Sequence, residues 1–529
     1  METAITRNLS LGYDYDAMAT ERFFKIVAVF GCQDDEFQPD DKFQRNTVEQ
    51  LNWIGWLFGV TMVPPMLICA LSLYPVRRFA FQLGLVDHPG GHSSHSQATP
   101  LGGGIGIWLG IMANFALGTL MVALARNNDA IKSRIPETIW PYLDGIWERS
   151  GEAWCLLLCG TILFVLGICD DRRGVKVGVR LLVEFAVAAF VVYGLGFGLT
   201  AFIEAAWLTN LLSVIWIVAV INSFNMLDNM DGLSGGVAAI ICASMAVVML
   251  TTPDPGSTRP QLFVAALLLV VCGSLLGFLW HNRPPAKIFM GDGGSYLVGF
   301  LVAVAMLLAT FAGGGGATPR PHAVLAPVCA MAVPMYDMAT VLWIRIRERR
   351  SLFQGDHSHF SHRLVGLGLS RPRAVLTIYL VTATCGLAAV LLTHVNVLQA
   401  AAVLGIVACM LSLVVILEST GWRKTASKAE RKSRFAFQNS RGFCWHAVRQ
   451  TSWGDAYQRR CRNHHAGQYL FGDFGRRIDL RVLFSERFGR SRKWRCAVVR
   501  RNCDPGRDDR NQRFDLESNF FASQLGRAR

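Results

Sequence analysis

The chain has 529 residues, of which 52% are hydrophobic, and it carries a formal net charge of +14 at pH 7. Its apolar residues come in blocks of about twenty, enough for a helix to cross roughly 30 Å of hydrocarbon. Open loops and unpaired strand edges cannot face lipid. The composition therefore excludes an ordinary water-soluble domain and predicts an all-α polytopic membrane protein.

The charge is distributed unevenly along the chain. Residues 421–529 contain 26 Lys and Arg against 10 Asp and Glu, so the basic surplus belongs to this segment. We divide the chain into a polar N-terminal segment (1–50), a transmembrane domain (51–420) and a basic tail (421–529). The tail lacks sustained periodicity. It fits a disordered extension attracted to anionic lipid, a small cytoplasmic domain, or out-of-frame translation after a sequence error.

In chain order, about eleven apolar blocks are expected to form transmembrane helices. They lie at roughly 53–75, 102–125, 153–169, 181–199, 205–221, 233–251, 261–280, 295–312, 323–343, 374–393 and 398–417. The connections after odd-numbered helices share one face and are the polar ones, whereas the others are short or featureless. Between the first and last helix the polar face carries 15 Lys and Arg against 6 opposite. The positive-inside rule therefore predicts that the polar face is cytoplasmic, with the N-terminus outside and the C-terminus inside.

The first three polar loops hold groups suited to phosphate and metal chemistry. The loop at 85–104 contains His95, and the loop at 167–180 contains an aspartate pair and a nearby arginine. The loop at 222–236 adds an asparagine and two further aspartates. Any one such group is more often a solvated surface residue. Ionisable residues gathered at helix ends of a lipid-spanning chain instead predict a functional site. In order, the aspartates are Asp170, Asp171, Asp228 and Asp231.

The fourth loop, at 281–295, contains Asn282, Phe289 and Asp292. Asp292 follows one glycine and precedes two more at an expected helix start, where free backbone N–H groups favour anions. Carboxylate and amide oxygens are the ligands that a hard cation such as Mg²⁺ prefers, together with substrate phosphates. These loops therefore predict a divalent-cation site.

The fifth loop, at 345–364, places His359 and His362 among several arginines, including Arg363. Such a group could hold a diphosphate by charge-assisted hydrogen bonds. The alternative is a basic juxtamembrane loop that binds lipid head groups. The arginine directly after His362 favours a site.

Over residues 50–420 the chain resembles the polyprenyl-phosphate N-acetylhexosamine-1-phosphate transferases. Five ordered motifs carry the resemblance: the DxP…H…TPxGG loop, the aspartate pair, NxFNMxDxxDGL, NxxPAxIFMGDxGS and the histidine loop. The family has eleven helices and a cytoplasmic active face. The resemblance implies transfer of a sugar-1-phosphate, most commonly N-acetylglucosamine-1-phosphate, from a UDP-sugar to undecaprenyl phosphate, with release of UMP. This reaction begins cell-wall or surface-polysaccharide assembly at the bacterial cytoplasmic (inner) membrane.

The resemblance also implies roles for individual residues. Asp292 and Asn225 match the ligands of Mg²⁺, or of Mn²⁺ in its place. The catalytic set implied is Asp170, Asp171, Asp228, His359 and His362, with one of the aspartate pair as general base. The substrate-binding set is Asp231, Asn282 and Phe289 for uridine, Arg180 and Arg363 for phosphate, and His95 of the first motif. The partners implied are the lipid and nucleotide substrates, with no nucleic acid. Homodimers occur in the superfamily, but nothing in this sequence requires one.

Two departures from the family pattern bear on activity. Relatives commonly have Arg-Lys before the first-motif histidine, where this chain has His92 and Ser93, and HxHH where this chain has Ser361 before His362. These changes leave a catalytically inactive homologue as an alternative. The related phospho-N-acetylmuramoyl-pentapeptide transferase is another, although its histidine loop differs. A transporter of an anionic solute is disfavoured because transporters place coupling residues near the bilayer midplane.

Overall fold

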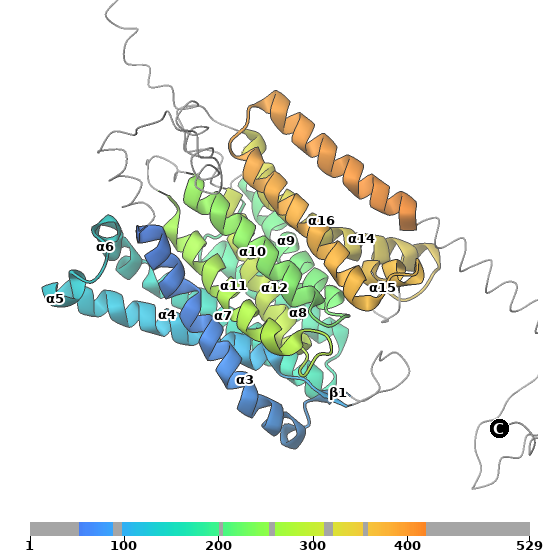
Figure 1. The fold of residues 1–529 in the computed structure, drawn as a ribbon, viewed down its shortest axis with the longest axis horizontal. Coiled ribbons are helices and arrows are strands. Elements are labelled where there is room, and N and C mark those ends of the chain that lie inside the picture. Colours follow the sequence, from blue (N-terminus) through green and yellow to red (C-terminus); the bar gives the residue numbers. More distant parts are fainter. Residues whose placement is uncertain are drawn as a thin grey trace, which may run out of the picture. The chain divides into compact units, whose positions relative to one another are not determined.

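The computed structural model describes residues 52–87, 98–199, 205–252, 260–310, 321–352 and 358–418. Within these ranges almost the whole chain is helical, and long helices lie side by side in a bundle (Figure 1). The prediction of an all-α polytopic protein is confirmed, since long apolar helices account for most of the described residues.

In the described part of the chain, ten continuous helices are long and apolar enough to cross a membrane. They are Asn52–Leu83, whose longer part is α3 (Val63–Leu83), α4 (Gly103–Asn127), α7 (Ser150–Arg173), α8 (Val177–Ala189) with its π-helical continuation Phe190–Gly194, α9 (Ala206–Leu227), α10 (Leu233–Thr251), α11 (Leu262–Asn282), α12 (Gly291–Ala309), α16 (Arg371–Leu392) and the final helix Val397–Glu418. An eleventh span is broken.

The broken span consists of residues Pro321–Ala330 and α14 (Ala332–Arg347), which meet at an angle of 65°. The first part contains the 3-10 turn Pro321–Leu325 and α13 (Ala326–Ala330). Pro334 lacks the N–H that would bond back to the preceding turn, which explains a bend at this place. The expected helix at 323–343 is therefore present as two segments.

The connection between α4 and α7 is more ordered than the sequence suggested. It contains α5 (Asp129–Lys132), a 3-10 turn (Glu137–Ile139) and α6 (Trp140–Glu148). The Trp140 indole N–H donates to the carbonyl of Ile135 at 3.0 Å. Arg126 Nε lies 3.1 Å from Asp144 Oδ1 and joins α4 to α6. These contacts hold short helices in a stretch without a long apolar block.

Two helix ends differ from the expected bounds, and both differences concern the site. α7 runs to Arg173, so the aspartate pair lies in its last turn and not in a loop. α12 begins at Gly291, four residues before the expected start, so Asp292 lies in its first turn. Hydrophobicity located the lipid-buried part of each helix but not its polar ends.

A small sheet lies within the first motif, and the chain that follows it pairs with the fourth motif. Strands β1 (Val86–Asp87) and β2 (Thr99–Pro100) pair antiparallel, with Val86 opposite Pro100. The chain after β2 then pairs with the fourth motif: Phe289 N donates to Pro100 O at 2.9 Å, and Gly103 N donates to Phe289 O at 2.8 Å. Motifs almost 190 residues apart in sequence are thus fixed to each other by backbone hydrogen bonds.

Helix α12 is the central helix of the bundle and is buried along nearly its whole length (Figure 1). Glycines let its first turn approach two neighbouring helices closely. A Cβ on Gly104 of α4 would come within 2.4 Å of the Gly294 nitrogen, and a Cβ on Gly167 of α7 would come within 2.4 Å of the backbone of Asp292 and Gly293. These contacts bring the ends of α4 and α7 against the start of α12.

Candidate active site

The N-terminus of α12 is the centre of the site, and Asp171 lies directly on it. Asp171 Oδ1 accepts a hydrogen bond from Asp292 N at 2.9 Å, and Oδ2 accepts one from Gly293 N at 3.3 Å. Unpaired N–H groups and the helix dipole favour a carboxylate at this position. Gly291 precedes these groups at φ 73°, and a Cβ on it would come within 2.6 Å of Asp171 Oδ2. The positive φ favours glycine here, and a side chain would also have to displace the Asp171 carboxylate.

Asp292 reaches the end of α9 through Asn225. The Asn225 side-chain amide donates to Asp292 Oδ1 at 2.6 Å and to Ser295 Oγ at 3.2 Å. Ser295 in turn donates to the Asp292 carbonyl at 3.2 Å. The two residues that the sequence predicted as metal ligands are therefore adjacent, although 67 residues separate them in the chain.

Asp170, like Asp171, has both oxygens engaged, but its partners are two side chains and the backbone of Val175 and not the backbone of α12. Oδ1 accepts from Val175 N at 2.7 Å. Oδ2 accepts from the Tyr296 hydroxyl at 2.9 Å and from Arg180 at 3.3 Å. The side chain thereby ties the end of α7 to α12 and α8.

The arginine of this cluster has a second carboxylate beside it. Arg180 Nε lies 3.9 Å from Glu184 Oε1, one helical turn further along α8, and the Glu184 side chain is fully buried. Asn222 of α9 donates to the other oxygen of Glu184. An ionisable group inside an apolar helix usually faces the bundle interior and has a partner. Glu184 and Tyr296 belong to the site, and the sequence analysis missed both.

Asp228 follows α9 and lies in the electrostatic field of the other carboxylates. Burial and the nearby Asp292, Asp171 and Asp231 together raise the pKa of Asp228 to about 8, against the lowering effect of a hydrogen bond from the Gly291 backbone. The site therefore concentrates negative charge around the start of α12.

Asn282 holds the third and fourth motifs together. Its amide oxygen accepts from Gly232 N at 2.8 Å, and its amide nitrogen donates to Ile288 O at 2.7 Å. Asp231 makes a parallel connection, because its Oδ2 accepts from Ala286 N at 3.0 Å. These contacts fix the loop that ends in Phe289, whose side chain is half-buried.

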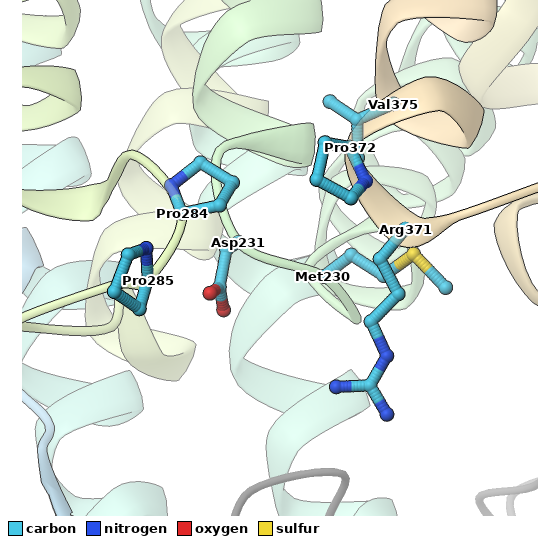
Figure 2. Close-up of a pocket in the computed structure, with 7 residues that line it drawn as sticks. All are labelled: Met230, Asp231, Pro284, Pro285, Arg371, Pro372 and Val375. Carbon is cyan, nitrogen blue, oxygen red and sulfur yellow. The ribbon is translucent and has the colours of Figure 1, made fainter.

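A pocket of about 350 Å³ opens beside this loop. Figure 2 shows the Asp231 carboxylate between the prolines of the 281–290 loop and the start of α16. The pocket thus combines an apolar wall with the carboxylate of Asp231, whose buried Oδ1 has no hydrogen-bond partner among the described residues. Its lining residues are Met230, Asp231, Pro284, Pro285, Arg371, Pro372 and Val375.

The histidine segment is held against the third motif and the interior of α14. α15 (Phe360–Gly366) starts directly after His359. His359 Nδ1 lies 2.9 Å from Asp337 Oδ2, and Ser361 donates to the side chain of Asn229 at 2.5 Å. The ring of His362 lies 6.4 Å from that of His359, measured between centroids. Ser361, one of the departures from the family pattern, is buried and bonded to the loop that carries Asp228.

Arg363 lies in a different environment from the one expected of a diphosphate ligand. Its guanidinium donates to Ser358 O at 2.6 Å and to Thr340 Oγ1 at 2.9 Å. Its Nε lies 3.1 Å from Glu418 Oε2, at the end of the final helix, and both side chains are less than 10% exposed. Tyr336 donates to the same carboxylate oxygen at 2.7 Å. The Arg363 guanidinium therefore contacts protein groups of three segments: the stretch before α15, α14 and the final helix.

The five predicted motifs thus come together at one end of the bundle. Direct hydrogen bonds or backbone pairing link the first to the fourth, the second to the fourth, the third to the fourth and the fifth to the third. His95 lies in 88–97, outside the described residues. Asp337 and Glu418 were missed; the signal for Asp337 was a lone carboxylate within an apolar block.

The donor set fits a hard divalent cation. Among the described residues no group of three or more His, Cys, Asp or Glu side chains is arranged to hold an ion. Mg²⁺ usually takes only one or two carboxylates and completes its shell with water and substrate phosphate. Asp292 with the Asn225 amide offers such a pair, and the surrounding carboxylates supply negative charge that a cation would offset.

Comparison with known proteins places this geometry in a family. Residues 153–310 match the model described as glycosyl transferase family 4. A probable undecaprenyl-phosphate N-acetylglucosaminyl 1-phosphate transferase of Bacillus subtilis (strain 168) is 29% identical over 364 residues, which cover 67% of this chain and 90% of the relative. A decaprenyl-phosphate N-acetylglucosaminephosphotransferase of Mycobacterium tuberculosis (strain ATCC 25618 / H37Rv) is 31% identical over 61% of this chain and 79% of the relative.

A third relative extends the similarity to enteric bacteria. The undecaprenyl-phosphate alpha-N-acetylglucosaminyl 1-phosphate transferase of Escherichia coli (strain K12) is 28% identical over 61% of this chain and 80% of the relative. The family model covers the second, third and fourth motifs, which surround the start of α12. This chain belongs to glycosyl transferase family 4, as one of the membrane-embedded polyprenyl-phosphate N-acetylhexosamine-1-phosphate transferases.

Proposed function

We propose that this protein transfers N-acetylglucosamine-1-phosphate from UDP-N-acetylglucosamine to undecaprenyl phosphate and releases UMP, at the start of cell-wall or surface-polysaccharide assembly. The observation that carries the proposal is the convergence of Asp171, Asp292 and Asn225 on the first turn of α12. The names of the relatives supply the sugar and the class of lipid acceptor.

The nucleotide is proposed to bind on the fourth-motif side of this centre. Asp231 Oδ1 is an available acceptor beside a pocket, and an acceptor of this kind suits the N–H of a uracil ring. Phe289 lies on the same loop, where an aromatic face can stack on the base. Asn282 then acts indirectly, by fixing this loop against Gly232.

The diphosphate of the donor is proposed to lie near Asp292 and Asn225, whose side-chain oxygens would hold Mg²⁺, or Mn²⁺ in its place. The cation, when bound, would offset the charge of the two phosphates and stabilise the leaving UMP. Asn225 is already placed within hydrogen-bond distance of Asp292, so the protein orients both groups in advance. His359 and His362 would contact the diphosphate from the fifth motif.

In the reaction, an oxygen of the lipid phosphate attacks the phosphorus attached to the sugar. The bond from that phosphorus to the UMP oxygen breaks, and UMP leaves with the bonding electrons. Asp170 has both oxygens engaged by Val175, Tyr296 and Arg180, which suits an orienting role. Asp171 is likewise held, by the backbone of α12, so Asp228 is proposed as the carboxylate available to a proton or to the cation's water shell.

The active face is proposed to be cytoplasmic, in the inner membrane of a bacterium. The support is the excess of Lys and Arg on this face. The proposed UDP-sugar donor is a cytoplasmic metabolite, whereas the prenyl chain of the proposed acceptor lies in the bilayer. A site at helix ends meets both substrates, and no soluble carrier is needed.

The test is release of UMP by the purified full-length protein in detergent, with UDP-N-acetylglucosamine and undecaprenyl phosphate. We expect release that requires both the lipid and Mg²⁺ and that stops when EDTA is added. Release without lipid would indicate a nucleotide hydrolase, and lack of release with any UDP-sugar would indicate an inactive homologue or another donor. Restoring the family residues at Ser93 and Ser361 would then separate these two explanations.

A further inference from the structure

A buried carboxylate outside the five motifs holds the histidine segment. Asp337 lies in the interior of α14 and is fully buried. Its Oδ2 lies 2.9 Å from His359 Nδ1, and its Oδ1 accepts from Phe360 N at 2.6 Å. One side chain therefore contacts both the ring and the backbone of the segment.

A carboxylate at this place would be costly without these partners. Ionisable groups inside membrane helices are expensive, and they persist where they pair and serve a function. A hydrogen bond from Phe360 N alone would be enough for Asp337 to act as a cap of α15. The second contact, to a histidine that is itself only 6% exposed, goes beyond what a helix cap requires.

The contact defines which nitrogen of His359 is available. A carboxylate accepts, so His359 Nδ1 carries the proton of this contact, and the ring's other nitrogen, Nε2, is the one left for a ligand. No described residue forms a hydrogen bond with Nε2. The neighbouring Ser361 is bonded to Asn229, so the same segment touches the loop that carries Asp228.

We propose that Asp337 is a positioning residue for the transfer reaction: it accepts from Nδ1 of the imidazolium form of His359 and orients the ring so that Nε2–H donates to the diphosphate of the donor. This inference rests on the proposed function for the identity of the ligand. Asp337 itself does not touch substrate; it acts through His359, as second partners of catalytic and metal-bound histidines do elsewhere.

The variant Asp337→Asn tests the role with little change in shape. Its amide oxygen can still accept from Phe360 N, but its NH₂ group then points at His359 Nδ1 and requires that nitrogen to be unprotonated. We expect UMP release to fall by roughly 10- to 100-fold in kcat/KM, the scale of losing one charge-assisted hydrogen bond. Thermal stability should change little, because the helix cap remains.

A double-mutant cycle separates positioning from a structural role. If Asp337 acts through His359, Asp337→Asn should cost almost nothing further in a His359→Ala background. A full additional loss in that background would overturn the proposal. If the single variant does not fold, a measurement of the His359 protonation state in the unaltered protein decides instead.

That measurement is the ¹⁵N spectrum of histidine-labelled full-length protein, with His359 assigned by difference from His359→Ala. We expect protonated Nδ1 in the unaltered protein and unprotonated Nδ1 in Asp337→Asn. Asp144→Asn is the matched control, because it makes the same substitution at an exposed carboxylate paired with Arg126 and should leave the His359 signal unchanged. Unprotonated Nδ1 in the unaltered protein would refute the proposal. Because no turnover is needed, this result stands even if the UMP assay shows that the proposed function is wrong.

Discussion

At the scale of single residues, the acidic groups of the site differ in what engages them. Asp170 is held by three protein groups, Asp171 by the backbone of α12, and Asp292 by Asn225. Asp170 and Asp171 are the same residue type at adjacent positions, yet their carboxylates have different hydrogen-bond partners. The sequence alone could not distinguish Asp170 from Asp171, because Tyr296, which engages Asp170, and the backbone that engages Asp171 both lie more than 100 residues away.

Asp292→Asn tests the proposed metal site. The amide keeps the size of the side chain and can still meet Asn225, but it removes a charge that would hold the cation. We expect normal insertion and folding with Mg²⁺-dependent turnover reduced by about 10³-fold or more. Turnover is measured as UMP release, and folding as the elution profile in detergent. Activity near that of the unaltered protein would show that Asp292 is not a metal ligand.

Glu418→Gln tests the buried pair that joins the final helix to α15. Removing one partner leaves the Arg363 charge buried without compensation, and breaking such a pair typically costs about 3–5 kcal/mol. We expect a clear fall in Tm in detergent. The double variant Glu418→Gln with Arg363→Met removes both charges and should recover part of the loss. Equal Tm values for all three proteins would mean that the pair contributes nothing to stability.

At the scale of elements, close helix packing builds the site. Membrane helices associate largely through small residues that let backbones approach. Gly104 and Gly167 place α4 and α7 against the first turn of α12, which is what allows Asp171 to reach the backbone of Asp292 and Gly293. Helix ends matter as much as helix faces, since the aspartate pair lies in the last turn of α7.

Gly104→Ala tests this packing. The added Cβ would lie 2.4 Å from the Gly294 nitrogen, which is backbone and cannot rotate away. We expect a destabilisation of about 1–3 kcal/mol and loss of most activity, measured by Tm and UMP release. Gly118→Ala on the same helix is the control, because its Cβ would meet nothing within 4 Å. If both variants behave alike, close packing at α12 is not required.

At the scale of the whole molecule, the number of spans decides which face each loop occupies. The described residues contain ten continuous spans, or eleven if the bent pair at Met331 crosses as one. With eleven, the five motifs share a face opposite the N-terminus, as the distribution of Lys and Arg predicts. The hydrogen bonds among the motifs agree with a common face, because they join all five at one end of the bundle.

Reporter fusions test the orientation. Alkaline phosphatase is active only outside the cytoplasm, so we expect activity when it is fused after residue 128 and none when it is fused after residue 174. Green fluorescent protein fused after residue 418 should fluoresce, which requires a cytoplasmic end. A phosphatase signal at 174 together with a dark fusion at 418 would invert the proposed topology.

The sequence by itself determined the fold class, the approximate position of each span and the motif residues, because hydrophobic blocks of membrane length and polar interruptions are local properties of the chain. It could not show that Asp337 and Glu418 hold the histidine segment, that Arg363 is buried, or that the span near Met331 is broken. Those features depend on which helices pack together. Only the tertiary structure brings a carboxylate of α14 to His359, and the pairing of buried charges is decided there.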